Sequence, residues 1–200
     1  MKKTPIRIGL AICALTLAAT AASAAPVTYT GTLSGAAENP PVPSPATGST
    51  IVVFDIDAHT LTVNMTFSGL LGATTASHIH CCTMLPNSGN AGVATETPTF
   101  NGFPLGVSSG TYSMSYDTSL ASSWSPAFLS NNGGTTAGAE AAFGAGLASG
   151  EAYLNIHTNL YSAGEIRSFL APVPEPGTWA MLLLGIPAVL GLRRRVTPGG

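Results

Sequence analysis

The chain has 200 residues, is 45% hydrophobic and only 8% charged, and carries a formal net charge of -2. Its basic residues gather near the two ends, so residues 25–171 hold eight Asp or Glu side chains against Arg167 alone, a net charge of -7 from one minus eight. Proteins that bind nucleic acid contact phosphate with Lys and Arg, so we exclude a nucleic-acid partner for this region.

Residues 1–24 have the three parts of a secretory signal peptide. Three basic side chains among the first seven residues precede an apolar run over residues 8–19, and the small residues Ala22-Ser23-Ala24 follow. A positive start, a short apolar stretch and an Ala-x-Ala exit are the features of a cleaved export signal. We expect export and cleavage after Ala24, and the alternative is an uncleaved anchor helix.

Residues 25–171 are long enough to bury one hydrophobic core, so we expect a single domain. Gly, Pro, Ser and Thr are abundant and long helical periodicity is nearly absent, which favours short strands joined by turns. We predict an all-β fold, an antiparallel β-sandwich or Greek-key barrel with one short helix, flanked by the signal peptide and a C-terminal transmembrane helix. The helix is expected at 135–147, and the strands at 28–33, 49–55, 60–67, 76–80, 110–116, 150–158 and 165–170.

Three histidines are the candidate metal ligands of the domain. His78 and His80 are two residues apart in an expected strand, so their side chains point to the same face. His157 ends another expected strand, and if the two strands are neighbours, three imidazoles converge. Such a group suits copper or zinc, and Cys81 or Cys82 could supply a fourth, tetrahedral ligand.

Other interpretations of these residues stay open at this point. The adjacent Cys81 and Cys82 can form a vicinal disulfide, remain thiols or bind a metal. The histidines can instead hydrogen-bond to carboxylates or backbone groups and order the loop after His80. The chain has no phosphate loop and no His-Glu-x-x-His motif, so we assign no catalytic residue and expect no enzyme.

Five segments of the chain follow the order of a known family, and they are residues 33–42, 46–48, 78–80, 150–158 and 164–167. Together they resemble the CHRD domain, which is named for repeats in chordin. The resemblance implies an immunoglobulin-like or barrel-like β module whose biochemistry is poorly known, and Cys81-Cys82 directly after the histidine pair departs from the family pattern. A weaker similarity to copper–zinc superoxide dismutase rests on the His-x-His strand, but the zinc-loop ligands of that family have no counterparts, so dismutase activity is not implied.

The C-terminal part has three consecutive features. Residues 172–177 form a proline-rich linker, residues 178–192 are nearly all apolar, and Arg193, Arg194 and Arg195 follow. We expect a transmembrane helix with its arginine cluster at 178–195, because arginines resist translocation and would stop the helix on the cytoplasmic side. An ordinary tail anchor that contacts membrane lipid has the same hydropathy and is the alternative.

The order of these features resembles the PEP-CTERM sorting signal, in which a Val-Pro-Glu-Pro motif precedes an apolar helix and a terminal arginine cluster. The resemblance implies that an exosortase-type enzyme cuts near the motif, so that enzyme is the expected processing partner. The matching residues are Val173, Pro174, Glu175 and Pro176.

The sequence therefore predicts a protein that is secreted across the inner membrane and membrane-anchored, then periplasmic or at the cell surface after processing. The first expected function is a non-catalytic surface or matrix module of the envelope or a biofilm, with exopolysaccharide as a partner that the resemblance implies. The alternative is an extracytoplasmic copper- or zinc-binding protein that uses the His-x-His strand.

Overall fold

The computed structural model describes residues 25–174, and all of the architecture reported below belongs to them. Eight strands form one antiparallel sheet in the order β4-β6-β7-β1-β2-β3-β5, with β8 paired to β1. The strands are β1 (Val27–Ser34), β2 (Thr47–Asp55), β3 (Thr60–Ser68), β4 (Thr74–His80), β5 (Gly110–Asp117), β6 (Tyr153–Thr158), β7 (Ile166–Phe169) and β8 (Ala171–Pro172). The helices are α1 (Pro126–Asn131) and α2 (Thr136–Ser149), with 3₁₀ turns η1 (Gly35–Ala37) and η2 (Ala121–Ser123).

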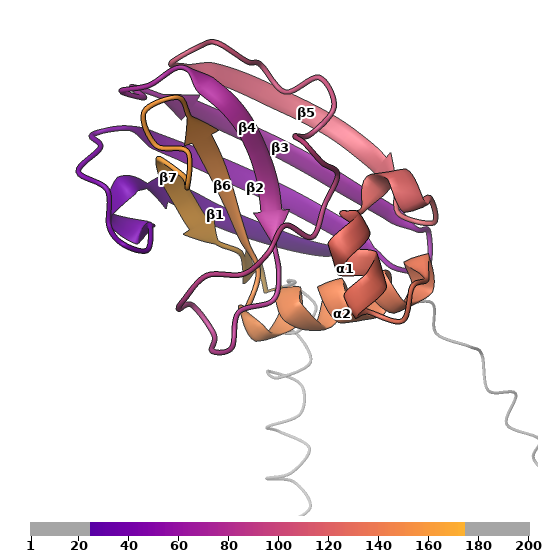
Figure 1. The fold of residues 1–200 in the computed structure, drawn as a ribbon. Helices are drawn as coiled ribbons and strands as arrows, with labels where there is room; N and C mark the ends of the chain where they lie inside the picture. The colour runs from indigo at the N-terminus through magenta and orange to yellow at the C-terminus, as the bar shows by residue number, and fades with distance from the viewer. Residues whose placement is uncertain (1–24, 175–200) are drawn as a thin grey trace, which may run out of the picture.

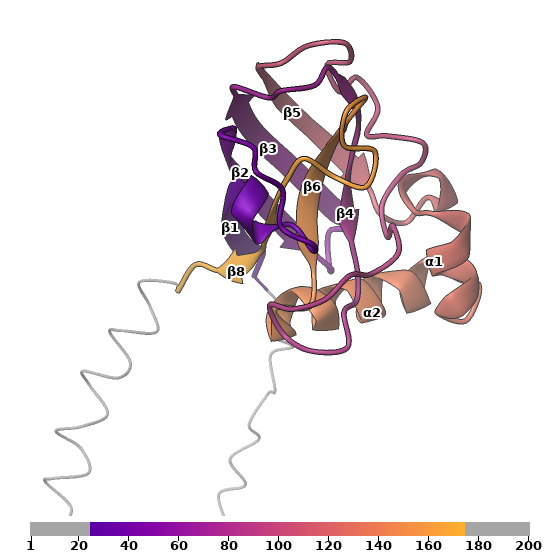
Figure 2. The ribbon, with the colours of Figure 1, turned by 60° about the vertical axis from the view of Figure 1, so that its left-hand side comes forward.

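The sheet curls into a half-barrel. Figures 1 and 2 show β4, β6 and β7 turned over to lie across from β2, β3 and β5. The antiparallel β fold is confirmed, and of the two predicted forms, a sandwich or a Greek-key barrel, the single curled sheet is nearer to the barrel. The reason is that β1 bonds to β2 along its whole length and also to β7 and β8, so the hydrogen-bonding path runs through the sheet without a break.

Strands β2 and β3 form a hairpin whose inner face packs against the core. The two strands pair in unbroken register from Thr47 opposite Ser68 to Asp55 opposite Thr60, as alternation in the sequence predicts. One face of β3 is fully buried, because a period of two places every second side chain on the inner side. Those side chains are Leu61, Val63, Met65 and Phe67.

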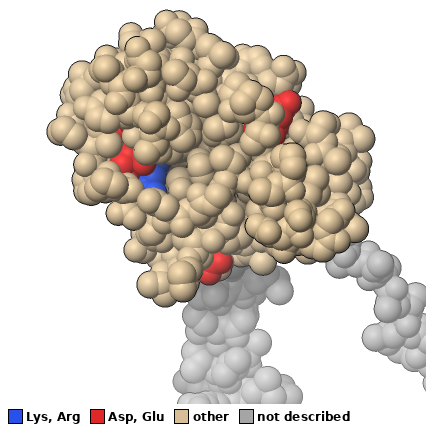
Figure 3. Space-filling model, in the orientation of Figure 1, with Lys and Arg blue, Asp and Glu red and all other residues tan. Residues whose placement is uncertain are grey.

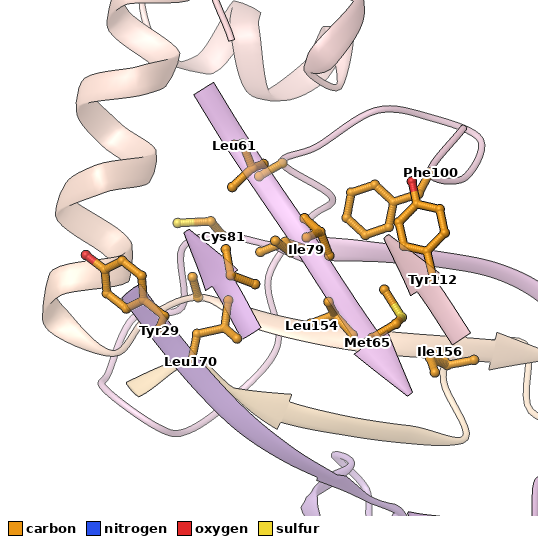
Figure 4. Close-up of a cluster of buried hydrophobic side chains, with 14 of the residues drawn as sticks. Tyr29, Leu61, Met65, Ile79, Cys81, Phe100, Tyr112, Leu154, Ile156 and Leu170 are labelled. Atoms are coloured by element: carbon orange, nitrogen blue, oxygen red, sulfur yellow. The ribbon is translucent and has the colours of Figure 1, made fainter. Parts of the chain in front are cut away.

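The strands β4 and β6 close over that hairpin and divide their side chains between two faces. Ile79, Leu154 and Ile156 point into the core with Met65, as Figure 4 shows. The alternation then places His78 and His80 on the opposite, outer face of the same sheet. His78 and His80 thus lie on a strand whose opposite face is held in place by the hydrophobic core.

Helix α2 runs across one open end of the curled sheet (Figures 1 and 2) and matches the helix expected from the sequence. Its N-cap Thr135 accepts a hydrogen bond from the Gly138 N–H, and it ends at Gly150 in a left-handed conformation with φ of 73°. Phe143 and Leu147 bury their side chains completely. The shorter α1 lies beside it, so the domain has a second short helix in addition to the one that the sequence predicts.

No helix within residues 25–174 is long and apolar enough to span a bilayer. The expected transmembrane helix at 178–195 and the signal peptide at 1–24 both lie outside the described residues.

Candidate functional site

The three predicted histidines come together on the outer face of β4 and β6. In the register of these strands, His78 lies opposite Asn155 and Ala76 opposite His157, so the two strands are neighbours. One ring nitrogen from each histidine lies within 4.8 Å of the other two. The ring centroids are separated by 5.2 to 5.8 Å. The expectation that three imidazoles converge is therefore confirmed for this part of the chain.

Each ring has one nitrogen bonded to a backbone carbonyl. His78 Nε2 is 2.6 Å from the oxygen of Pro98, His80 Nδ1 is 2.9 Å from that of Ala91, and His157 Nδ1 is 2.9 Å from that of Ser162. A carbonyl oxygen can only accept, so each of these nitrogens carries the proton of a neutral imidazole. The other nitrogen of each ring is left with a bare lone pair.

The remaining nitrogens face one another. His78 Nδ1 is 3.3 Å from His157 Nε2, and His80 Nε2 is buried without a hydrogen-bond partner. Burial lowers the pKa of all three rings, to about 4 for His80, and the nearby His157 lowers the pKa values of His78 and His80 further. The rings are therefore neutral at pH 7, which is the form that can bind a metal ion.

Two neighbours complete the surroundings of this histidine cluster. The Tyr153 ring stacks on His80 with centroids 4.8 Å apart and planes inclined by 2°. Asn155 is buried on the same face, and its Oδ1 has no hydrogen-bond partner. The cluster thus has an aromatic wall and one unused amide oxygen.

The only basic residue of the domain, Arg167, ties loops together beside the cluster. Its Nε donates to the oxygen of Ala37, and one terminal nitrogen donates to the oxygens of Gly89 (3.0 Å) and Asn90 (2.8 Å). The Glu38 carboxylate is 3.8 Å away, and Figure 3 shows blue beside red in a hollow of an otherwise mostly uncharged face.

Glu38 and Arg167 are both almost fully buried, and the second carboxylate oxygen of Glu38, Oε1, has no hydrogen-bond partner. Burial raises the pKa of Glu38 to about 7, although the Arg167 charge acts in the opposite direction.

Glu165 is also buried, and both of its carboxylate oxygens accept hydrogen bonds. Its two carboxylate oxygens accept from Ser44 Oγ (2.7 Å), the Leu71 N–H (2.6 Å), the Gly72 N–H (3.1 Å) and Thr158 Oγ1 (2.8 Å). Burial alone would raise the pKa of this carboxyl, but the four donors outweigh it and hold the pKa below its usual value. This carboxylate anchors loops and is not free to act on a substrate.

The structure does not bring Cys81 and Cys82 to the histidine cluster. Their sulfurs are bonded to each other in a vicinal disulfide, which is one of the three states that the sequence leaves open. The disulfide packs against α2 at Gly146, where any Cβ would collide with both sulfurs. Cys81 follows His80 by one residue, so strand alternation turns it toward the core and away from the imidazoles.

The start of the predicted sorting motif is the end of the sheet. In β8, Pro172 pairs with Tyr29 of β1, and the Val173 N–H donates to the oxygen of Thr28 at 2.8 Å. Val173 and Pro174 are both exposed. Glu175, Pro176 and the arginines at 193–195 lie outside the described residues.

The sequence does not reveal several of the residues that shape the site. The carbonyls of Ala91, Pro98 and Ser162 are backbone groups, and backbone groups leave no side-chain signal. His59, in the turn between β2 and β3, pairs with the buried Glu140 at 2.9 Å. That hydrogen bond and the carboxylate charge raise the pKa of His59.

Comparison with protein-family models gives two matches. The CHRD domain model matches residues 29–170, and the model of the PEP-CTERM protein-sorting motif matches residues 172–195. The two matches abut at β8, where the described sheet ends. No curated protein and no solved structure matches the chain.

Proposed function

Because the chain belongs to the CHRD domain family, we propose that it is a non-catalytic module held at the bacterial envelope, where it serves as a surface or biofilm-matrix component. The sorting-motif match makes it an exported protein that is processed by exosortase, a membrane enzyme, and anchored or displayed at the surface. Neither matched family is a catalytic domain family, which supports a role in binding or structure.

The observation that carries the proposal is where the fold ends. The last strand, β8, has only two residues, both exposed, and lies beside the start of β1. The sorting motif begins at the next residue, Val173. A cut near the motif would therefore remove the tail without removing a core strand, so the β domain would stay folded after processing.

The disulfide bond and the acidic surface of the domain fit an extracytoplasmic location. Disulfides persist in oxidising compartments, and Cys81 and Cys82 are bonded to each other. With Arg167 buried, the exposed charges of residues 25–171 are acidic. An acidic surface is a poor partner for nucleic acid and keeps an exported module soluble.

The test is deletion of residues 174–195 in the producing bacterium. We expect the full chain in the membrane or surface fraction and the shortened chain in the medium or periplasm, with an unchanged thermal melting curve. A matched control replaces Arg193, Arg194 and Arg195 by Ser, which keeps the apolar segment and removes only the charges that stop translocation. Retention of the shortened chain at the membrane would overturn the tether.

The polysaccharide role has its own measurement. The released domain should co-sediment with exopolysaccharide isolated from the same cells and should not co-sediment with lipid vesicles, because the apolar tail has been removed. Co-sedimentation with vesicles alone would replace the polysaccharide partner with membrane lipid.

A further inference from the structure

We propose that His78, His80 and His157 form a transition-metal site, selective for copper over zinc, on the outer face of β4 and β6. The site lies in the folded domain and is separate from the sorting function, which belongs to the C-terminal motif. It gives the module a ligand that neither matched family model supplies.

A purely structural role leaves the cluster incomplete. The three carbonyl partners take the one proton that each neutral ring has, so no ring has a donor left to give inward. The contact of 3.3 Å between His78 and His157 then sets two lone pairs against each other. His80 Nε2 is buried with no partner, which costs free energy unless something binds there. A single cation satisfies all three nitrogens.

The spacing of the nitrogens fits a metal ion. Zinc and copper lie about 2.0–2.1 Å from imidazole nitrogens, so a tetrahedral ion needs nitrogens about 3.3–3.4 Å apart. The His78–His157 pair already has this spacing at 3.3 Å. All three ligand atoms lie within 4.8 Å of one another, so binding of one ion requires the more distant nitrogens to move closer together than they are without metal.

The groups around the rings orient them as the outer groups of metal sites do. A histidine that binds a metal usually donates its other N–H to a carbonyl or carboxylate, which fixes the tautomer and the ring plane. Here all three rings do so, and Tyr153 additionally stacks on His80. The buried Asn155 side chain lies beside His80 on the same face and favours the protonated form of that ring, so it is a further polar group next to the three nitrogens.

The donor set points to copper or zinc rather than to magnesium or calcium. All three ligands are neutral imidazoles, whereas hard cations require oxygen ligands. The cysteine sulfurs are bonded to each other, so no thiolate shifts the preference. For a fixed set of nitrogen ligands, divalent copper binds more tightly than zinc.

The test uses the full chain, purified in detergent, stripped with a chelator and then dialysed against copper or zinc salts. We expect close to one copper per chain by elemental analysis, nitrogen hyperfine structure in the copper(II) electron paramagnetic resonance spectrum, and displacement of zinc by copper. His80→Gln and His157→Gln should each lower the copper affinity at least tenfold. The matched control His59→Gln removes a histidine outside the cluster and should keep the copper.

Folding defects can be separated from ligand loss. His157 is only half-buried, so His157→Gln should keep the melting curve of the metal-free protein even if His80→Gln does not. A wild-type chain that holds no copper after dialysis would overturn the site. Copper that remains in His157→Gln with unchanged affinity and spectrum would overturn it equally.

Discussion

Glu165 and the histidine cluster are both buried polar groups beside β6, yet their lone pairs are used differently. The Glu165 carboxylate accepts from four donors, two of them backbone N–H groups. In the histidine cluster the outer nitrogens are satisfied by carbonyls, while the inner ones face one another with His80 Nε2 unpaired. A complete set of partners marks a structural element, and a convergent, incomplete set marks a place for a ligand.

The largest effect that this comparison predicts comes from Glu165→Ala. The variant leaves four donors without their acceptor, two of them backbone N–H groups in the loop at Leu71 and Gly72. We expect a loss of about 3–5 kcal/mol in the free energy of unfolding, measured by urea denaturation. A loss below about 1 kcal/mol would show that water replaces the carboxylate and that the structural assignment is wrong.

The histidine cluster should behave in the opposite way, with a small effect that grows when metal is added. His157→Gln should change the unfolding free energy of the metal-free chain by less than about 1 kcal/mol, because the ring is half-exposed. Copper at a hundred times its dissociation constant should stabilise the wild type by about 2.7 kcal/mol and the variant by almost nothing. If copper stabilises wild type and His157→Gln equally, the distinction between Glu165 as a structural group and the histidine cluster as a ligand site is wrong.

The parts of this contrast that depend on local pattern could be predicted from the sequence. The i, i+2 spacing of His78 and His80 places both rings on one face, and β3 alternates as expected. The same alternation, applied one residue further, already turns Cys81 to the other face, so its removal from the ligand set was predictable.

The remaining parts depend on long-range pairing. His78 and His157 are 79 positions apart and meet only because β4 pairs with β6. The single curled sheet forms because β1 pairs with both β2 and β7. A sandwich would contain the same strands with the same alternation, so the alternation in the sequence does not distinguish the two folds. The carbonyls that fix the ring tautomers belong to loops, where any residue type can present them.

Glu38 lies beside the cluster and sharpens the comparison through pH. Burial raises its pKa in the folded state to about 7, above the ordinary value of 4.5, so the folded chain holds this proton to a higher pH than the unfolded chain does. The stability that it contributes is therefore complete below pH 4.5 and is lost as the pH rises to about 7. We expect wild type to lose about 2 kcal/mol across this window relative to Glu38→Gln, measured by urea titration at several pH values.

Glu165 provides the reference with the opposite sign. Its folded pKa is lowered, so its contribution is present above the unfolded value and is lost as the pH falls through the folded pKa.

The prediction for Glu38 has a clear contradicting outcome. Wild type that keeps its stability relative to Glu38→Gln from pH 4.5 to pH 8 would show that Arg167 compensates fully for the burial of Glu38.

The smallest expected effect belongs to His59, the histidine that lies outside the cluster. Its ring is largely exposed, but the buried Glu140 carboxylate raises its pKa through a hydrogen bond of 2.9 Å. The stabilisation from this pair is complete below the unfolded pKa of His59 and is lost as the pH rises through the raised folded value. His59→Gln should therefore lower the melting temperature slightly at pH 5.5 and leave it unchanged at pH 9, because exposed pairs contribute little. A change that is equal at both pH values would mean that the ring acts through packing rather than charge, and the contrast between one acid-paired histidine with a raised pKa and three histidines with lowered pKa values would fail.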